Sequence, residues 1–243
     1  MGVENLIQEN LLPVEGTALL FGSKGAIGST IAATFERQGW RVVTVSHVAD
    51  SRSEYSVGEE DWVSRLGESG HLFNCVIWAQ GTNLSDSVDT FDSAAYRHVL
   101  KANLDFVVST MSQVLNSSLL APNARLTVLS SIWATLARSQ KLSYMISKAG
   151  LQALVRSAAI DLAARGVSVN SVSPGVIDSP MTRSFISEVS LERIAERSNG
   201  GKLATLQEVA DVVCWLSGPN ASGLSGQDLI VDRGWGTFSN VDP

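Results

Sequence analysis

A tyrosine and a lysine four residues apart are the pair in this chain best suited to move protons. Tyr144 and Lys148 stand in the segment Ser143-Tyr-Met-Ile-Ser-Lys148, and on a helix that spacing places both side chains on one face. A phenol with an ordinary pKa of about 10 exchanges protons poorly at neutral pH. A neighbouring ammonium group favours the phenolate and lowers that pKa. The pair therefore predicts a catalytic acid or base at Tyr144.

Two further polar residues are candidates for the same site. Ser131 follows a predicted strand just before the helix of Tyr144, and side chains at the carboxyl edge of a parallel sheet point into the ligand crevice. We expect the Ser131 hydroxyl to reach the substrate oxygen that Tyr144 protonates. Asn103 stands in the middle of a predicted helix, where an amide adds little to stability. It would hold a water molecule that links Lys148 to solvent; a buried amide satisfied by hydrogen bonds is the alternative.

A glycine-rich segment is placed to bind a phosphate. Gly22-Ser-Lys-Gly-Ala-Ile-Gly28 directly follows one predicted strand and opens a predicted helix. Glycines let the backbone come close to a pyrophosphate, and the helix N-terminus offers free N–H groups with partial positive charge. The residues of this turn that we expect to contact a dinucleotide are Gly22, Ser23, Lys24, Ala26, Ile27 and Gly28.

The end of the second predicted strand bears on the choice of cofactor. An acidic residue there binds the adenosine ribose and selects NAD. This chain has Ser46 and His47 instead, with Lys24 in the turn and Arg52 nearby. A missing carboxylate and two neighbouring cations would accommodate a 2′-phosphate, which favours NADP(H) over NAD(H). The alternative is that Lys24 and Arg52 are merely solvated surface residues.

The elements that must position these residues alternate along the chain. Short apolar runs predict buried strands, and the amphipathic segments between them predict helices. This alternation favours right-handed βαβ units, and hence a single domain over residues 1–243 with a doubly wound, Rossmann-type parallel α/β sheet and helices on both faces. The predicted strands are 17–21, 40–45, 53–57, 73–79, 125–130, 167–172 and 228–231; the predicted helices are 26–38, 59–66, 92–116, 143–165, 191–197 and 207–217.

Composition limits the class of protein. The chain has 243 residues, of which 44% are hydrophobic and 17% charged, with a net charge of −6. This acidic balance argues against nucleic acid as a partner. There is no apolar run of the roughly 20 residues that a membrane span needs, and no signal peptide, so we expect a cytoplasmic protein without a membrane partner. Cys75 and Cys214 are expected to be free thiols, and the three histidines show no metal-ligand spacing, so no metal is expected.

Together these motifs resemble the short-chain dehydrogenase/reductase family over residues 16–236. The turn is similar to the family's Thr-Gly-xxx-Gly-Ile-Gly, and Tyr144 and Lys148 match its Tyr-xxx-Lys. Ser131 stands thirteen residues before Tyr144, where the family has its catalytic serine, and Asn103 matches the fourth catalytic position. The resemblance implies hydride transfer between nicotinamide and a small-molecule ketone or secondary alcohol. It implies that Tyr144 donates the proton and that Ser131 stabilises the developing oxyanion. Lys148 would bind the nicotinamide ribose, and Asn103 would complete the proton relay.

The resemblance also extends to other cofactor contacts. Asn170-Ser-Val-Ser-Pro-Gly175 is similar to the family's segment beside nicotinamide, and Ser179 falls where the family has a threonine that contacts the carboxamide. The further cofactor contacts that it implies are Ala79, Gln80, Gly81, Tyr144, Lys148, Pro174, Gly175, Ile177 and Ser179.

The chain departs from the family pattern at a few positions. Phe21 replaces the threonine of the turn and Ala26 its middle glycine, so Gly25 is expected to supply flexibility one residue early. Trp78-Ala-Gln-Gly81 replaces Asn-Asn-Ala-Gly, so we expect Gln80 or Trp78 to adjust how adenosine is held. These departures affect cofactor geometry more than chemistry.

The resemblance leaves the substrate and the assembly open. It implies a substrate flap over residues 179–200, an apolar wall that includes Trp133 and Phe185, and a homo-oligomer, either tetramer or dimer. One alternative function is a 3-oxoacyl-carrier-protein reductase. Such relatives place basic residues before the serine strand to dock the acidic carrier, whereas the turn Ala121-Pro-Asn123 has only Arg125 and Arg165 nearby. Another is a non-catalytic dinucleotide-binding regulator on the same fold, against which the complete Ser-Tyr-Lys set argues.

Overall fold

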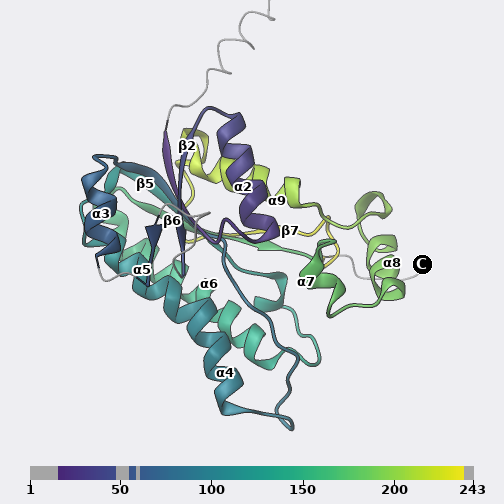
Figure 1. The fold of residues 1–243 in the computed structure, drawn as a ribbon. Helices are drawn as coiled ribbons and strands as arrows, with labels where there is room; N and C mark the ends of the chain where they lie inside the picture. The colour runs from purple at the N-terminus through teal and green to yellow at the C-terminus, as the bar shows by residue number, and fades with distance from the viewer. Residues whose placement is uncertain (1–15, 48–54, 59–60, 238–243) are drawn as a thin grey trace, which may run out of the picture.

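Seven parallel strands form one sheet, in the order β3-β2-β1-β4-β5-β6-β7 (Figure 1). The computed structural model describes residues 16–47, 55–58 and 61–237. The direction of winding reverses between β1 and β4, so a ligand crevice is expected above the carboxyl ends of these two strands. The predicted doubly wound fold is confirmed. The strands are β1 Thr17–Phe21, β2 Arg41–Ser46, β3 Tyr55–Ser56, β4 Phe73–Trp78, β5 Leu120–Leu129, β6 Ser168–Pro174 and β7 Asp228–Val231.

Helices cover both faces of the sheet because alternate strand residues point to opposite sides. Ala18 and Leu20 of β1 belong to a core with α2 (Ala26–Arg37) and α9 (Leu206–Ser217). Leu19 and Phe21 belong to a second core on the other face. The helices of that second core are α3 Trp62–Glu68, α5 Phe106–Leu115 and α6 Leu142–Leu162. Strands buried on both faces explain the nearly continuous apolar runs in the sequence.

The predicted helix over residues 92–116 is interrupted in its middle. It consists of α4 (Ser93–Leu100), a π-helical turn at Lys101–Asp105, and α5. The wider turn is closed by the Phe106 N–H, which donates to the Lys101 carbonyl, and such turns often occur at functional sites. Asn103 lies in this turn and is fully buried.

Other boundaries also differ from the predictions. β5 begins at Leu120, before the predicted strand, and its register against β4 shifts between Phe73 and Cys75. The helix predicted over 59–66 begins only at Trp62. Two short helices, α7 (Pro180–Arg183) and α8 (Glu188–Glu196), follow β6 and extend beyond the sheet edge (Figure 1).

Two departures from the family pattern compensate for each other. Phe21 and Trp78 are register partners across β1 and β4, and their rings stack with centroids 5.5 Å apart and planes 3° apart. Trp78 also donates from Nε1 to Thr110 Oγ1 at 2.9 Å, and both aromatic residues are buried in the core. The expectation that Trp78 adjusts adenosine binding is therefore wrong, because its side chain fills the core below α5.

The two cysteines of the chain are buried, and across residues 16–47, 55–58 and 61–237 no helix combines the length and apolarity of a membrane span. Cys75 and Cys214 are both free and buried, and burial raises the pKa of Cys214 to about 12. Both thiols therefore stay protonated and inert within the core.

Candidate active site

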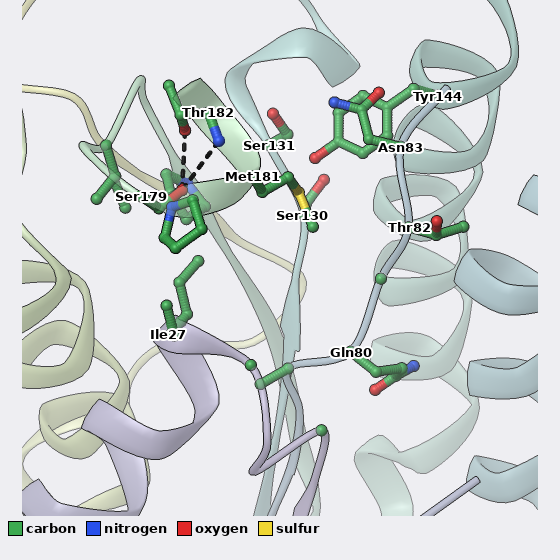
Figure 2. A pocket seen from close by; sticks show the side chains of 18 of the residues that line it. Ile27, Gln80, Thr82, Asn83, Ser130, Ser131, Tyr144, Ser179, Met181 and Thr182 are labelled. Carbon is green, nitrogen blue, oxygen red and sulfur yellow. Dashed lines mark hydrogen bonds between the residues drawn. The ribbon is translucent and has the colours of Figure 1, made fainter. Parts of the chain in front are cut away.

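A cavity of about 760 Å³ opens at the carboxyl edge of the sheet. Its lining comes from the turn after β1, from the segments after β4, β5 and β6, and from α7. Figure 2 shows Ile27 and Gln80 toward one end, and Ser131, Tyr144 and Asn83 toward the other. We call these the nucleotide end and the substrate end. The cavity lies where the reversal of strand order predicts a ligand site.

Two glycines fix the backbone of the turn at the nucleotide end. Gly22 has φ +84°, and a Cβ there would lie 2.5 Å from the Gln80 backbone nitrogen. A Cβ at Gly28 would lie 2.1 Å from the Gly22 carbonyl oxygen. The expectation that Gly25 supplies the flexibility is wrong, because its φ of −73° suits any residue. The turn therefore depends on Gly22 for its shape and on Gly28 for the approach of α2.

The residues at this end fit a dinucleotide. The N-terminus of α2 has no side-chain cap and no acidic residue in its first turn, so its N–H groups can receive an anion. The Gln80 side chain lines the same cavity, and both of its polar atoms are buried without a hydrogen-bond partner among the described residues. Such an orphaned amide costs free energy unless a ligand satisfies it. His47 and Phe106 line the same cavity, and their rings stack with centroids 5.5 Å apart.

Ser131 and Tyr144 both line the substrate end (Figure 2). Ser131 lies two residues after β5 and accepts a hydrogen bond from the Trp133 N–H at 3.3 Å. Lys148 lies on the same helix as Tyr144, and its Nζ is 5.7 Å from the tyrosine ring centroid. The ammonium is buried and donates to the Leu129 carbonyl at 2.8 Å. The i, i+4 spacing thus puts both groups on one face, with Lys148 behind the cavity wall.

The pKa values of Tyr144 and Lys148 are shifted in opposite directions. Burial raises the pKa of Tyr144 above its ordinary value, while a hydrogen bond with Ser131 acts to lower it. Burial lowers the pKa of Lys148 to about 8. The expectation that the pKa of Tyr144 is lowered is therefore wrong for the protein without a cofactor. Desolvation of the phenol outweighs the groups that stabilise its charged form.

Both polar atoms of the Asn103 side chain have hydrogen-bond partners. Its Oδ1 accepts from the Thr82 N–H at 2.7 Å, and its Nδ2 donates to the Thr82 carbonyl and to Ser147 Oγ, both at 2.9 Å. The side chain therefore ties the segment after β4 to α6, as the alternative expectation had it.

Sequence reasoning missed four residues around the substrate end. Asp86 is buried and accepts hydrogen bonds from the N–H and hydroxyl of Ser143, which fixes the start of the helix of Tyr144. Lys141 donates to Asn83 Oδ1 at 2.9 Å, and Arg138 lines the cavity. The sequence carried only a weak signal: the fourteen positions from Ser131 to Tyr144 contain two cations and no acidic residue.

Comparison with known proteins assigns the family. Residues 58–236 match a family model described as enoyl-(acyl carrier protein) reductase, which covers well over half of the chain. The chain belongs to the short-chain dehydrogenase/reductase family. Enzymes of this family are oxidoreductases that act on alcohol or ketone groups with NAD(P), so this short-chain dehydrogenase/reductase is one too.

Several relatives extend over nearly the whole length. A cis-4-hydroxycyclohexanecarboxylate dehydrogenase of Sinomonas cyclohexanicum is 29% identical over 91% of this chain and 96% of its own. The 3-oxoacyl-[acyl-carrier-protein] reductase FabG of Escherichia coli is 24% identical over 89% of this chain and 96% of its own. The aldohexose dehydrogenase of Thermoplasma acidophilum shares the fold, with a TM-score of 0.83 at 20% identity, covering 96% and 98% of the two chains.

Most predicted cofactor residues of this short-chain dehydrogenase/reductase share the one cavity. Gly28 and Lys148 do not line it, since each lies behind residues that do, and Arg52 is outside the described residues. Ser179 caps α7 by accepting from the Thr182 N–H at 3.1 Å (Figure 2). The predicted cofactor residues that line the cavity are Gly22, Ser23, Lys24, Ala26, Ile27, Ser46, His47, Ala79, Gln80, Gly81, Tyr144, Pro174, Gly175, Ile177 and Ser179.

Proposed function

We propose that this enzyme interconverts a free small-molecule ketone and its secondary alcohol, with Tyr144 as the acid or base. The observation that carries the proposal is that Tyr144 and Ser131 share one cavity with the glycine-rich turn. A substrate whose carbonyl oxygen lies between the two hydroxyls would occupy the same cavity as a dinucleotide bound at the turn.

The roles of the residues follow from their positions. In reduction the carbonyl carbon would gain a hydride, which a bound nicotinamide cofactor would supply, and the oxygen would gain a proton from the protein. Tyr144 donates that proton, and Ser131 donates a hydrogen bond to the developing oxyanion. Lys148 keeps its ammonium behind the wall, with donors left for ribose hydroxyls. Because burial raises the pKa of Tyr144 in the protein alone, the positive charge that favours the phenolate is supplied with the oxidised cofactor.

NADP(H) is the proposed cofactor. Ser46 and His47 line the cavity where a carboxylate would select NAD, and Lys24 lines it from the turn. A hydroxyl, an imidazole and an ammonium suit a 2′-phosphate better than a bare ribose. Initial rates with NADPH and NADH in one assay compare the two cofactors directly.

Replacement of the phenol tests the function. Tyr144→Phe should lower kcat/KM for carbonyl reduction by about a thousandfold, since the proton donor is lost while the ring is kept. Fluorescence titration should give unchanged NADPH affinity. Tyr96→Phe, on α4 and outside the cavity, should retain activity. Turnover by Tyr144→Phe close to that of the wild type would refute the assignment of the acid.

A carrier-bound substrate is the second candidate. It is favoured by the names of several relatives that reduce 3-oxoacyl groups on a carrier protein. A free alcohol is favoured by the named substrate of another relative, a hydroxycyclohexanecarboxylate. Residues 121–123, which lie in the first part of β5 and not in a turn, offer no cation. Arg165 donates to the Leu115 carbonyl at 3.2 Å. We therefore place the free substrate first.

We also propose that the enzyme is a homo-oligomer. Val108 of α5 is 44% exposed and Ile160 of α6 is 79% exposed. A shallow depression between the two helices includes Leu104, Gly150 and Leu154. An apolar strip of this kind suits a second copy of the chain.

A further inference from the structure

An arginine at the substrate end, Arg138, has no acidic partner among the residues that the structure describes. Arg138 lines the cavity together with Tyr144. Its Nη2 donates to the Phe185 carbonyl at 3.5 Å, and its guanidinium carbon lies 5.3 Å above the ring of Trp133. Within 4.0 Å, ion pairs among the described residues involve Arg183 and Arg233 but not Arg138. A guanidinium carries five N–H donors, so most of its capacity for hydrogen bonds is unused.

A second cation stands beside it. Lys141 is only 3% exposed, and its Nζ donates to Asn83 Oδ1 and to the Leu84 carbonyl, at 2.9 and 3.3 Å. The same nitrogen lies 3.7 Å from the centroid of the Phe185 ring. Two neutral acceptors and an aromatic face hold the ammonium in place, but they do not neutralise its charge.

The charges of this region do not balance. Burial and the nearby Arg138 both lower the pKa of Lys141, to about 8, and Asp86 opposes them. The oxygens of Asp86 already accept the N–H and hydroxyl of Ser143. Among the described residues, Asp86 is the carboxylate whose charge acts on Lys141, and Arg138 is a second cation beside it. Unpaired charge in a partly desolvated site is costly unless an anion binds there.

Apolar residues line the same cavity as the arginine and the catalytic hydroxyls. Trp133, Phe185, Met181 and Ile186 all line the cavity, and Trp133 is supported by an edge contact with Trp235 at 5.7 Å. A ligand that fills this space therefore has a carbon skeleton, with polar groups only where it meets a polar side chain.

We propose that the substrate is an oxo acid or its hydroxy acid, and that Arg138 binds its carboxylate. The inference rests on the proposed function, since the carbonyl or alcohol would lie at Ser131 and Tyr144. A guanidinium pairs with a carboxylate through two parallel hydrogen bonds. Lys141 adds positive potential behind Phe185 and Asn83 without touching the ligand.

Matched acid and ester pairs test this assignment. Reduction of 4-acetylbenzoate and of 5-oxohexanoate is compared with reduction of their methyl esters. In the wild type, kcat/KM should favour each acid over its ester by at least about tenfold, chiefly through KM. Arg138→Met should abolish this preference, and Arg138→Lys should keep part of it, because a lysine restores the charge but not the paired geometry.

Arg183→Met is the control. Arg183 is an arginine of α7 that pairs with Asp178 and Glu188 outside the cavity, and its loss should leave the preference unchanged. Equal use of acids and esters by the wild type would overturn the proposal. An equal loss of activity toward acids and esters in Arg138→Met would also overturn it. That result is expected if Arg138 only holds the Phe185 backbone in place.

Binding separates this inference from the proposed function. If neither acids nor esters are reduced, the proposed chemistry fails for these compounds. Calorimetry with benzoate and benzamide on the NADP⁺-loaded protein then decides the inference alone. Binding of benzoate by the wild type, its loss in Arg138→Met and no binding of benzamide would support the anion site. Absent benzoate binding, or equal binding by both proteins, would overturn it.

Discussion

The two ends of the cavity are built from different materials. At the nucleotide end the decisive groups are backbone: Gly22 with φ +84°, Gly28 packed against the Gly22 carbonyl, and the uncapped N-terminus of α2. At the substrate end they are side chains, with Arg138 and Lys141 among aromatic walls. A backbone site leaves a fixed spacing of glycines in the sequence, whereas a side-chain site can be built from many combinations. The first end therefore identifies the family and the second sets what the enzyme acts on.

Among variants that test this contrast between the two ends, one that breaks the backbone of the nucleotide end should have the largest effect. In Gly28→Ala the new Cβ would lie 2.1 Å from the Gly22 carbonyl oxygen, so α2 must move away from the turn. We expect an NADPH affinity lower by about a hundredfold and a loss of about 2 to 3 kcal/mol in unfolding free energy. Fluorescence titration and urea denaturation measure the two.

Gly25→Ala is the matched control, because the nearest atom to its new Cβ is 3.6 Å away and its φ is −73°. Its unfolding free energy should stay within about 0.5 kcal/mol of the wild type. If Gly28→Ala binds NADPH as tightly as the wild type, the turn is not the rigid element that we describe, and the contrast between the two ends fails.

The same contrast explains what could be predicted from sequence. β1 is buried on both faces and gives a clear apolar run, so it was predicted with its observed bounds. The bounds of β7 were also predicted, although it is an edge strand with exposed and half-buried residues. The π-helical turn around Asn103 was not predicted, because it depends on hydrogen bonds to Thr82 and Ser147, which are distant in sequence. Local pattern cannot report such pairings.

The candidate site was predicted where residue spacing fixes it. Tyr144, Lys148 and Ser131 were found from spacing, and the structure brings them together. The direction of the Tyr144 pKa shift was not predicted. The burial that raises this pKa depends on the whole fold, and its effect outweighs that of a neighbouring charge such as Lys148. Arg138 was missed because a single arginine in a loop has no periodicity to distinguish it from a surface charge.

Lys148 lies where the two ends meet, and its burial can be measured as a pH dependence of stability. Its pKa is lowered from 10.5 to about 8 in the folded protein. Between these values the unfolded chain binds a proton that the folded protein has released, so unfolding free energy rises with pH. The wild type minus Lys148→Met should thus rise by about 2 kcal/mol between about pH 7.5 and pH 9.5.

The difference between two proteins is needed because other buried groups titrate as well. Burial also lowers the pKa of Lys141 and raises that of Cys214, and both contributions cancel when the two denaturation curves are subtracted. Lys202→Met, at an exposed position, should give a difference that does not change with pH. A flat difference for Lys148→Met would show that solvent reaches the ammonium, and that the ends are joined by water.

The smallest effect should come from the support behind the substrate end. Asp232 accepts from the N–H groups of Gly234 and Gly236, at 2.8 Å each, and this bend carries Trp235 against Trp133. Trp235→Leu keeps an apolar residue but loses the edge contact, so KM for a reducible ketone should rise by roughly three- to tenfold, or about 1 kcal/mol.

NADPH affinity should not change in this variant, because Trp235 does not line the cavity. Trp215→Leu, an exposed tryptophan of α9, is the control and should change neither quantity. Steady-state kinetics and fluorescence titration on the same preparations give both numbers. A fall in NADPH affinity equal to the rise in KM would mean that the C-terminal segment supports both ends. The substrate end could not then change independently of the nucleotide end, and the separation that the cavity suggests would be lost.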